Sequence, residues 1–463
     1  MTAPSPTFYA DRRRALADRF DTPVLLVGNG KQARNFPANP LPFRQDSTFL
    51  YFTGCRRPDA ALLVHGDRHT LFVPVPGAGD ALWHGPTPGL AELAERYGLE
   101  VAPARVLADR VAALPQPPKA LAVADPRRTA LARRLTGAAL EYGPLNGDEE
   151  LIQAVIDLRL ALQPAEVVAM RAAAAVTARA HTAAMAATRP GRTEAQIAAL
   201  FDGTCAAHGM TTAYHSIVTV RGEVLHNEHY DQTLRDGQLL LLDGGAESPA
   251  GYATDVTRTW PVSGRFSPRQ RAAYDAVLQS QQDAIHLCRP GTRYREVHLA
   301  SCRTLTRFLV DEGLLRGQVD GLVERGAHAL FFPHGIGHLL GLDVHDMEIF
   351  GDRAGYAPGR ARSEQFGLSY LRLDRDLAPG MVVTIEPGFY VVPAILADAA
   401  LLDRFSDALD REAAATWAGF GGIRIEDDVL VTAGDPDVLT GDIPKAPDAL
   451  EALVGTGELT LAV

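Results

Sequence analysis

The chain has 463 residues, of which 46% are hydrophobic and 22% are charged, and its formal net charge is −11. This length predicts two domains, and the composition is typical of a soluble globular protein with a sizeable core. The acidic balance disfavours binding to the phosphate backbone of nucleic acids, so a nucleic acid is not an expected partner.

The sequence carries no signal for a membrane or for secretion. No apolar run approaches the roughly 18 residues needed to span a bilayer, and the N-terminal basic cluster is not followed by an apolar segment. The cysteines lack CxxC spacing, which predicts free thiols in a reducing compartment; they are Cys55, Cys205, Cys288 and Cys302. We therefore expect a cytoplasmic protein that does not associate with membranes.

The first third of the chain alternates short apolar runs with helical patterns, which predicts an α/β domain over residues 1–158. The helical patterns cover residues 90–98 and 128–137. The apolar runs that read as strands are residues 22–30, 59–66, 69–76 and 119–125.

An Ala-rich segment, residues 148–188, predicts helical structure that Pro164 interrupts, as expected for a connecting helix followed by the first helix of a second domain. The second domain, residues 159–463, mixes both element types and is predicted to be α+β. Its expected helices are residues 193–208, 267–288 and 293–313, and its expected strands are residues 238–245, 252–260, 381–392 and 422–432. The segments 351–380 and 394–418 look like insertions with their own loops or short helices.

The stretch HGIGHLLGLDVH, residues 334–345, contains two histidines four positions apart, which is the spacing of the zinc-binding HExxH helix. Gly335 stands where that motif needs a glutamate, and Pro333 and the glycines of the stretch weaken a helix. The sequence therefore predicts extended or irregular backbone here. A histidine in this stretch is also compatible with a structural role.

Four acidic residues lie on apolar strand candidates: Asp243, Asp255, Glu386 and Glu426. A buried carboxylate without compensation costs several kcal/mol, so each acid alone is compatible with a structural ion pair. Together with a glycine-flanked histidine, the four acids predict a two-metal centre. Oxygen-dominated ligation with one imidazole favours Mn²⁺ or a similar ion, and such a pair can hydrolyse an amide.

Six motifs in this order resemble the pita-bread metallopeptidases, specifically the proline-directed branch of aminopeptidase P and prolidase. The resemblance covers nearly the whole chain, and it implies a pita-bread catalytic domain preceded by a smaller α/β domain. The motifs are FRQDSTFLYFTGCRRPDA, LLLLDGGAE, GYATDVTRT, PHGIGHLLGLDVHD, TIEPGFY and GFGGIRIEDD.

The resemblance also implies roles for individual residues. The implied metal ligands are Asp243, Asp255, His338, Glu386 and Glu426, with Asp255 and Glu426 bridging two ions and Glu386 also transferring a proton. The implied cofactor is two divalent ions, Mn²⁺ first, with Co²⁺, Zn²⁺ and Fe²⁺ as alternatives.

The remaining implied site residues face the substrate. His226 matches a histidine that stabilises the tetrahedral intermediate, and His345 matches one that positions the scissile carbonyl. His334 matches a histidine of the proline pocket, and Arg424 matches an arginine that steadies the carboxylates.

One departure from the family bears on the metal centre. The separation of Asp243 and Asp255 is one position longer than is usual in the family. We expect the additional residue in the turn around residues 248–251, because an additional residue inside a strand would turn one aspartate away from the site.

The implied activity is hydrolysis of an Xaa-Pro bond at the N-terminus of peptides, by a homodimer. The YFTG motif favours an aminopeptidase, whereas Arg372 matches an arginine with which prolidases bind the C-terminal carboxylate of a dipeptide. Arg372 is equally compatible with a solvated arginine. The alternatives are an Xaa-Pro dipeptidase and, more remotely, a metal-free binding protein or a creatinase-like amidinohydrolase.

Overall fold

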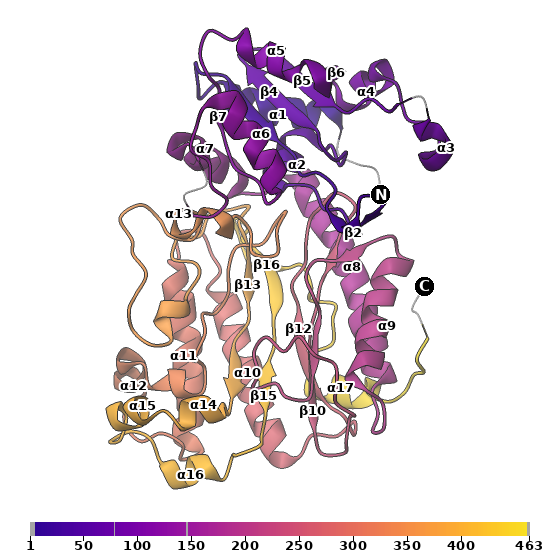
Figure 1. Ribbon diagram of the computed structural model, residues 1–463. Coiled ribbons are helices and arrows are strands. Elements are labelled where there is room, and N and C mark those ends of the chain that lie inside the picture. Colours follow the sequence, from indigo (N-terminus) through magenta and orange to yellow (C-terminus); the bar gives the residue numbers. More distant parts are fainter. Residues whose placement is uncertain (1–4, 78, 145–146, 461–463) are drawn as a thin grey trace. The chain divides into compact units, whose positions relative to one another are not determined.

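The computed structural model describes residues 5–77, 79–144 and 147–460 (Figure 1). The chain divides into two compact units, residues 1–160 with 347–354, and residues 161–346 with 355–463. Among the described residues, no helix combines the length and the apolar character needed to cross a bilayer.

The first unit is built on a five-stranded mixed sheet with the strand order β6-β5-β4-β1-β7. Its core contains buried residues of the sheet and its helices, among them Leu25 and Phe72. The strands are β1 (Val24–Val27), β4 (Ala61–His65), β5 (Arg68–Val73), β6 (Glu100–Pro103) and β7 (Lys119–Ala120), and β2 (Ala33–Phe36) pairs separately with β3 (Asn39–Pro40). The α/β prediction is confirmed.

Four helices of the first unit begin where the sequence offers a capping aspartate or a proline: α1 (Pro6–Ala17), α2 (Ser47–Thr53), α6 (Pro126–Thr136) and α7 (Glu149–Arg159). Asp148 caps the last of them by accepting a hydrogen bond from the Leu151 backbone. The other helices are α3 (Asp80–His84), α4 (Leu90–Tyr97) and α5 (Leu107–Ala112), with 3-10 turns η1 (Ala104–Val106) and η3 (Glu348–Phe350) and the short α13 (Asp352–Gly355).

In the second unit, long helices pair with each other and cover the strands (Figure 1). The first pair is α8 (Pro164–Ala187) with α9 (Glu194–Ala207), and the second is α10 (Pro268–His286) with α11 (Tyr294–Asp311). Pro164 begins α8, where its missing N–H removes no hydrogen bond. The shorter helices are α12 (Val319–Arg325), η2 (Ala327–Leu330), η4 (Leu368–Tyr370), α14 (Pro393–Leu396), α15 (Ala399–Arg404), α16 (Arg411–Ala415) and α17 (Pro447–Leu453).

The strands of the second unit form small antiparallel sheets rather than one continuous sheet. Two hairpins among them carry the four acidic residues, as described below. The strands are β8 (Thr211–Thr212), β9 (Ile217–Thr219), β10 (Leu239–Asp243), β11 (Ala246–Glu247), β12 (Thr257–Pro261), β13 (Val382–Ile385), β14 (Gly388–Tyr390), β15 (Gly422–Arg424), β16 (Asp427–Leu430) and β17 (Asp437–Val438).

Three predicted strands differ from the structure. The strand predicted at 252–260 begins only at Thr257. The strands predicted at 381–392 and 422–432 are each interrupted, at residues 386–387 and 425–426. Pro387 has no N–H to donate, and the N–H of Glu426 donates to the carbonyl of Thr257 on the other hairpin. The interruptions therefore lie where the two hairpins meet.

Candidate metal centre

The hairpin of β10 and β12 brings the two aspartates onto one face. Asp243 pairs with Thr257, and the same register continues to the turn, where Ser248 exchanges backbone hydrogen bonds with Gly251 and Tyr252. Because side chains alternate between faces, Asp255 lies on the face of Thr257 and hence of Asp243. No register shift interrupts this ladder, as expected if the additional residue lies in the turn.

The two strands approach each other so closely at Gly245 that no side chain fits there. A Cβ atom at this position would lie 1.8 Å from the carbonyl oxygen of Thr254. The glycine that follows Asp243 in the sequence LLLLDGGAE is therefore a requirement of the hairpin that aligns the aspartates.

The second hairpin places Glu386 opposite Glu426. The pairing of β13 with β16 and of β14 with β15 keeps one register across the interruption, and Ile425 still donates to the carbonyl of Pro387. In that register the two glutamates are directly opposed, so their side chains lie on the same face. The interrupted strands thus still deliver both predicted acids to one site.

His338 lies on irregular backbone, as predicted for residues 334–345. The Thr384 side chain accepts a hydrogen bond from the His338 backbone, and the His338 Nδ1 lies 3.0 Å from the carbonyl oxygen of Leu339. A proton on Nδ1 satisfies that carbonyl and leaves Nε2 as the ligand atom. Nε2 is 3.4 Å from an oxygen of Asp255 and 3.8 Å from one of Glu386.

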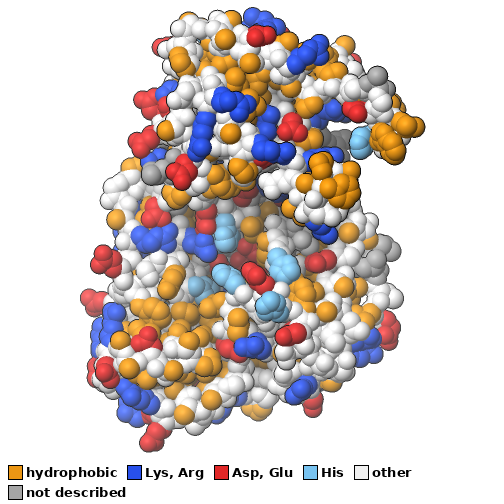
Figure 2. Space-filling model, in the orientation of Figure 1, with side chains coloured by type: hydrophobic (Ala, Val, Ile, Leu, Met, Phe, Trp, Pro, Cys, Tyr) orange, Lys and Arg blue, Asp and Glu red, His pale blue; other side chains and the backbone are white. Residues whose placement is uncertain are grey.

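The five predicted ligands form one cluster. In each of two groups of three, the possible ligand atoms lie within 4.8 Å of one another: His338, Glu386 and Glu426, and Asp243, Asp255 and Glu426. A third such group joins Asp255 and His338 to His345. Figure 2 shows histidines gathered around acidic side chains on one face of the second unit.

The electrostatics of the cluster reflect burial of several negative groups together. Burial raises the pKa of Asp243, although the positive charge of Arg424 reduces this increase. Burial beside the other acids raises the pKa of Glu426 far above its usual range. Burial raises the pKa of Glu386 to about 7. Burial also acts to raise the pKa of Asp255, but hydrogen bonds from His338 and Tyr214 hold it below its usual value.

Arg424 and Thr257 connect the two hairpins through the cluster. Arg424 donates from Nη2 to Asp243 at 2.6 Å and from Nε to the Thr257 hydroxyl at 2.9 Å. The Thr257 hydroxyl in turn donates to Glu426 at 2.7 Å. A guanidinium and a hydroxyl thus fix the orientation of one carboxylate from each hairpin.

The substrate-facing candidates lie beside this cluster. The ring of His345 is 4.3 Å from that of His338, centroid to centroid. His334 Nε2 is 2.8 Å from the Tyr390 hydroxyl, and burial lowers its pKa to about 3, so the ring is neutral. His226 is half-exposed, and its pKa is lowered by burial and by the charges of Arg424 and Arg372. Arg372 therefore lies close enough to act on the site.

Sequence reasoning missed three residues that support the acids. The Tyr214 hydroxyl lies 2.5 Å from an oxygen of both Asp243 and Asp255. The Asp428 carboxylate accepts from the backbone N–H of Asp255. Thr257 and Asp428 belong to motifs already recognised and were overlooked as neighbours of ligands, whereas Tyr214 lies outside every motif and only the fold brings it here.

Comparison with known proteins agrees with this geometry. The profile of the aminopeptidase P N-terminal domain matches residues 9–120. The chain is 32% identical to the Xaa-Pro aminopeptidase of Escherichia coli K12, with 96% of each chain covered. A solved structure of aminopeptidase PepP from Pseudomonas aeruginosa matches with a TM-score of 0.80 and 32% identity, and Zn-substituted E. coli aminopeptidase P in complex with product matches with a TM-score of 0.80 and 31% identity; each alignment covers 98% of both chains.

These matches confirm the resemblance to proline-directed pita-bread peptidases and the predicted fold. The profile of metallopeptidase family M24 matches residues 168–433, more than half of the chain and nearly all of the unit that carries the acid cluster. The near-full-length match to an Xaa-Pro aminopeptidase favours a metallopeptidase over the metal-free binding protein and the amidinohydrolase, and the family implies divalent metal ions. The chain is a metallopeptidase and belongs to metallopeptidase family M24.

Proposed function

We propose that this protein is an Xaa-Pro aminopeptidase, which hydrolyses the bond between the first residue of a peptide and a following proline. Near-full-length similarity to an Xaa-Pro aminopeptidase supports this activity over that of a dipeptidase. The Xaa-Pro bond is a tertiary amide without an N–H, so a peptidase that holds its substrate by that N–H cannot use it. A site that grips the carbonyl oxygen and the ring avoids this difficulty.

The observation that carries the proposal is the charge of the site. Four buried or nearly buried carboxylates, Asp243, Asp255, Glu386 and Glu426, converge with one imidazole, His338, and Arg424 forms an ion pair with one of them, Asp243. Divalent cations fit this donor set, because oxygen ligands with one imidazole suit Mn²⁺ or a related ion. We propose these five residues as ligands of two ions, Mn²⁺ first, with Co²⁺, Zn²⁺ or Fe²⁺ as alternatives.

Such ions would activate a water molecule and polarise the scissile carbonyl. The remaining steps belong to side chains. We assign the transfer of the proton to Glu386, whose carboxylate lies among the proposed ligands, 3.8 Å from Nε2 of His338. The neutral ring of His334, backed by Tyr390, suits the wall of a proline pocket. We assign His226 to the oxyanion of the tetrahedral intermediate and His345 to the scissile carbonyl.

The test is a substrate-length series with metal-free protein reconstituted with Mn²⁺. We expect release of the first residue from Xaa-Pro-Xaa and longer peptides, no cleavage of the matched Xaa-Ala-Xaa peptides, and two bound ions per chain. Asp255→Asn should lose both metal and activity. A folded protein that binds two ions and leaves every proline peptide intact would contradict the proposal.

Arg372 favours a second candidate, an Xaa-Pro dipeptidase, because its charge acts on both His226 and His334. If its guanidinium binds the carboxylate of a dipeptide, Arg372→Ala should reduce turnover of Xaa-Pro by about 10- to 100-fold, as expected for a lost charged hydrogen bond. Turnover of Xaa-Pro-Xaa should change little. Arg411→Ala, which removes an exposed arginine, is the matched control.

Three further assignments complete the proposal. We place the domain boundary at 158/159, near the division of the compact units. The four cysteines are free and buried, which supports a reducing, cytoplasmic location. We propose a homodimer, for which the exposed Leu82 and Trp83 on α3 offer an apolar contact. Sedimentation analysis of the wild type and of Trp83→Ser tests it.

A further inference from the structure

A second cluster of metal-ligand side chains lies in the second unit, apart from the acids. His298 and Cys302 are one turn apart on α11, and His328 lies on η2. Their possible ligand atoms lie within 4.8 Å of one another. All three side chains are fully buried, at 0% exposure. We name them the His-Cys-His trio.

The trio leaves buried polar atoms without partners. Neither ring nitrogen of His328 forms a hydrogen bond with any residue that the structure describes, and Nδ1 of His298 is likewise unpartnered among them. A buried imidazole nitrogen without a hydrogen-bond partner destabilises the folded protein. A metal ion bound between the side chains would satisfy one nitrogen of His328, and His298 would bind it through Nε2, the nitrogen that contacts Sγ of Cys302.

The geometry points to a metal ion. Nε2 of His298 lies 3.4 Å from Sγ of Cys302. Two ligands of one ion, at about 2.0 Å for nitrogen and 2.3 Å for sulfur with angles of 109–120°, would lie roughly 3.5–3.7 Å apart. The pair is therefore already within a few tenths of an ångström of a shared coordination sphere, and a ligand atom of His328 lies within 4.8 Å of both.

We propose that the His-Cys-His trio binds one thiophilic, monovalent metal ion of the Cu⁺ class. One thiolate and two imidazoles form the soft donor set that Cu⁺ prefers, whereas the carboxylates of the catalytic centre are hard donors that suit Mn²⁺. On binding, the thiol of Cys302 releases its proton and its sulfur bonds the ion, so one proton leaves for each Cu⁺ taken up.

The charge of the surroundings selects the monovalent ion. A thiolate with Cu⁺ is neutral, whereas a divalent ion would leave a net positive charge in a fully buried site, which is costly. The charged side chains that act on the trio are Arg295 and Arg303, both cations. They would oppose a positive complex and tolerate a neutral one.

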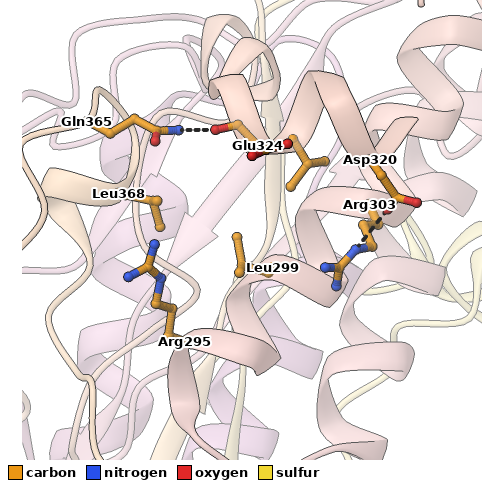
Figure 3. A pocket seen from close by; sticks show the side chains of 8 residues that line it. Arg295, Leu299, Arg303, Asp320, Glu324, Gln365 and Leu368 are labelled. Atoms are coloured by element: carbon orange, nitrogen blue, oxygen red, sulfur yellow. Dashed lines mark hydrogen bonds and ion pairs between the residues drawn. The ribbon is translucent and has the colours of Figure 1, made fainter. Parts of the chain in front are cut away.

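A pocket of about 600 Å³ lies beside α11, the helix that carries His298 and Cys302 (Figure 3). Leu299 and Leu368 line it. Gly367, the neighbour of Leu368, has its backbone against His328, where a Cβ would lie 3.8 Å from Nε2. The pocket therefore approaches the trio through residues adjacent in sequence to His298 and Gly367.

The experiment is a titration of Mn²⁺-loaded protein with Cu⁺, without oxygen, in competition with the chromophoric chelator bicinchoninate. We expect one Cu⁺ per chain. Cys302→Ser and His328→Gln should weaken binding by more than ~100-fold, beyond the effect of substitutions outside the ligand set. Cys288→Ser is the matched control, because Cys288 is equally buried and donates to a helix carbonyl instead. A parallel titration with Zn²⁺ should show weaker binding at the trio.

Copper-edge X-ray absorption of the wild type decides the matter even if a variant fails to fold. One sulfur and two nitrogen neighbours support the proposal. It is overturned if the wild type takes up no Cu⁺, if Cys302→Ser binds as tightly as the wild type, if Zn²⁺ binds the trio and Cu⁺ does not, or if the copper has only oxygen and nitrogen neighbours.

Discussion

Replacing Thr257 with valine tests how the two hairpins are held together at the acids. Valine keeps the shape of threonine and removes the hydroxyl that donates to Glu426 at 2.7 Å and accepts from Arg424 at 2.9 Å. Thr257 is fully buried, so water cannot replace the lost partner. A hydrogen bond to a charged group contributes about 1.5–3 kcal/mol, and we expect a loss of unfolding free energy on the order of 3 kcal/mol for the metal-free protein.

The same substitution frees the carboxylate of Glu426 to rotate, so the affinity for Mn²⁺ should fall by about 10- to 100-fold. Urea unfolding followed by tryptophan fluorescence measures the stability, since Trp260 lies buried on the same strand, and Mn²⁺ titration measures the affinity. Thr257→Ser retains the hydroxyl and serves as the control. Equal stability and equal Mn²⁺ affinity in the two variants would refute the reasoning.

Three other predictions concern the same unit. Gly245→Ala should abolish Mn²⁺ binding, because the added Cβ would lie 1.8 Å from a carbonyl oxygen. The control is Gly434→Ala, whose Cβ would have no atom closer than 3.9 Å and which should bind Mn²⁺ normally. Metal analysis of the two purified variants distinguishes them. Arg258→Met should lower the free energy of unfolding by about 3–5 kcal/mol, because it removes an ion-pair partner of the buried Asp427 carboxylate. A urea midpoint unchanged from the wild type would count against this prediction. In the folded, metal-free protein, burial raises the pKa of Glu386 from 4.5 to about 7, so folding favours the protonated side chain. The resulting contribution to the free energy of unfolding is fully present below pH 4.5 and is lost as the pH rises to about 7. Melting temperatures in EDTA should therefore fall across this range, and less steeply in Glu386→Gln; equal slopes would argue against the raised pKa.

The sequence by itself determined the class of fold and the identity of the acids. Apolar runs of strand length and helical periodicity are local properties, so four of the five strands of the main sheet in the first unit, its helices α4 and α6 and the paired long helices were predictable. The acids and the histidine stretch stood out because each interrupts an apolar or glycine-rich pattern. The glycine and proline content around His334 and His338 was also sufficient to exclude a zinc-binding helix.

Only the tertiary structure decided how these residues meet. The predicted strand at 422–432 is interrupted where Glu426 donates its N–H to the carbonyl of Thr257, a partner 169 positions away in the chain. Tyr214 reaches both aspartates from outside every motif. The His-Cys-His trio joins α11 to η2, which no local pattern predicts. Such contacts depend on packing between segments distant in sequence, and propensity and periodicity report only on near neighbours.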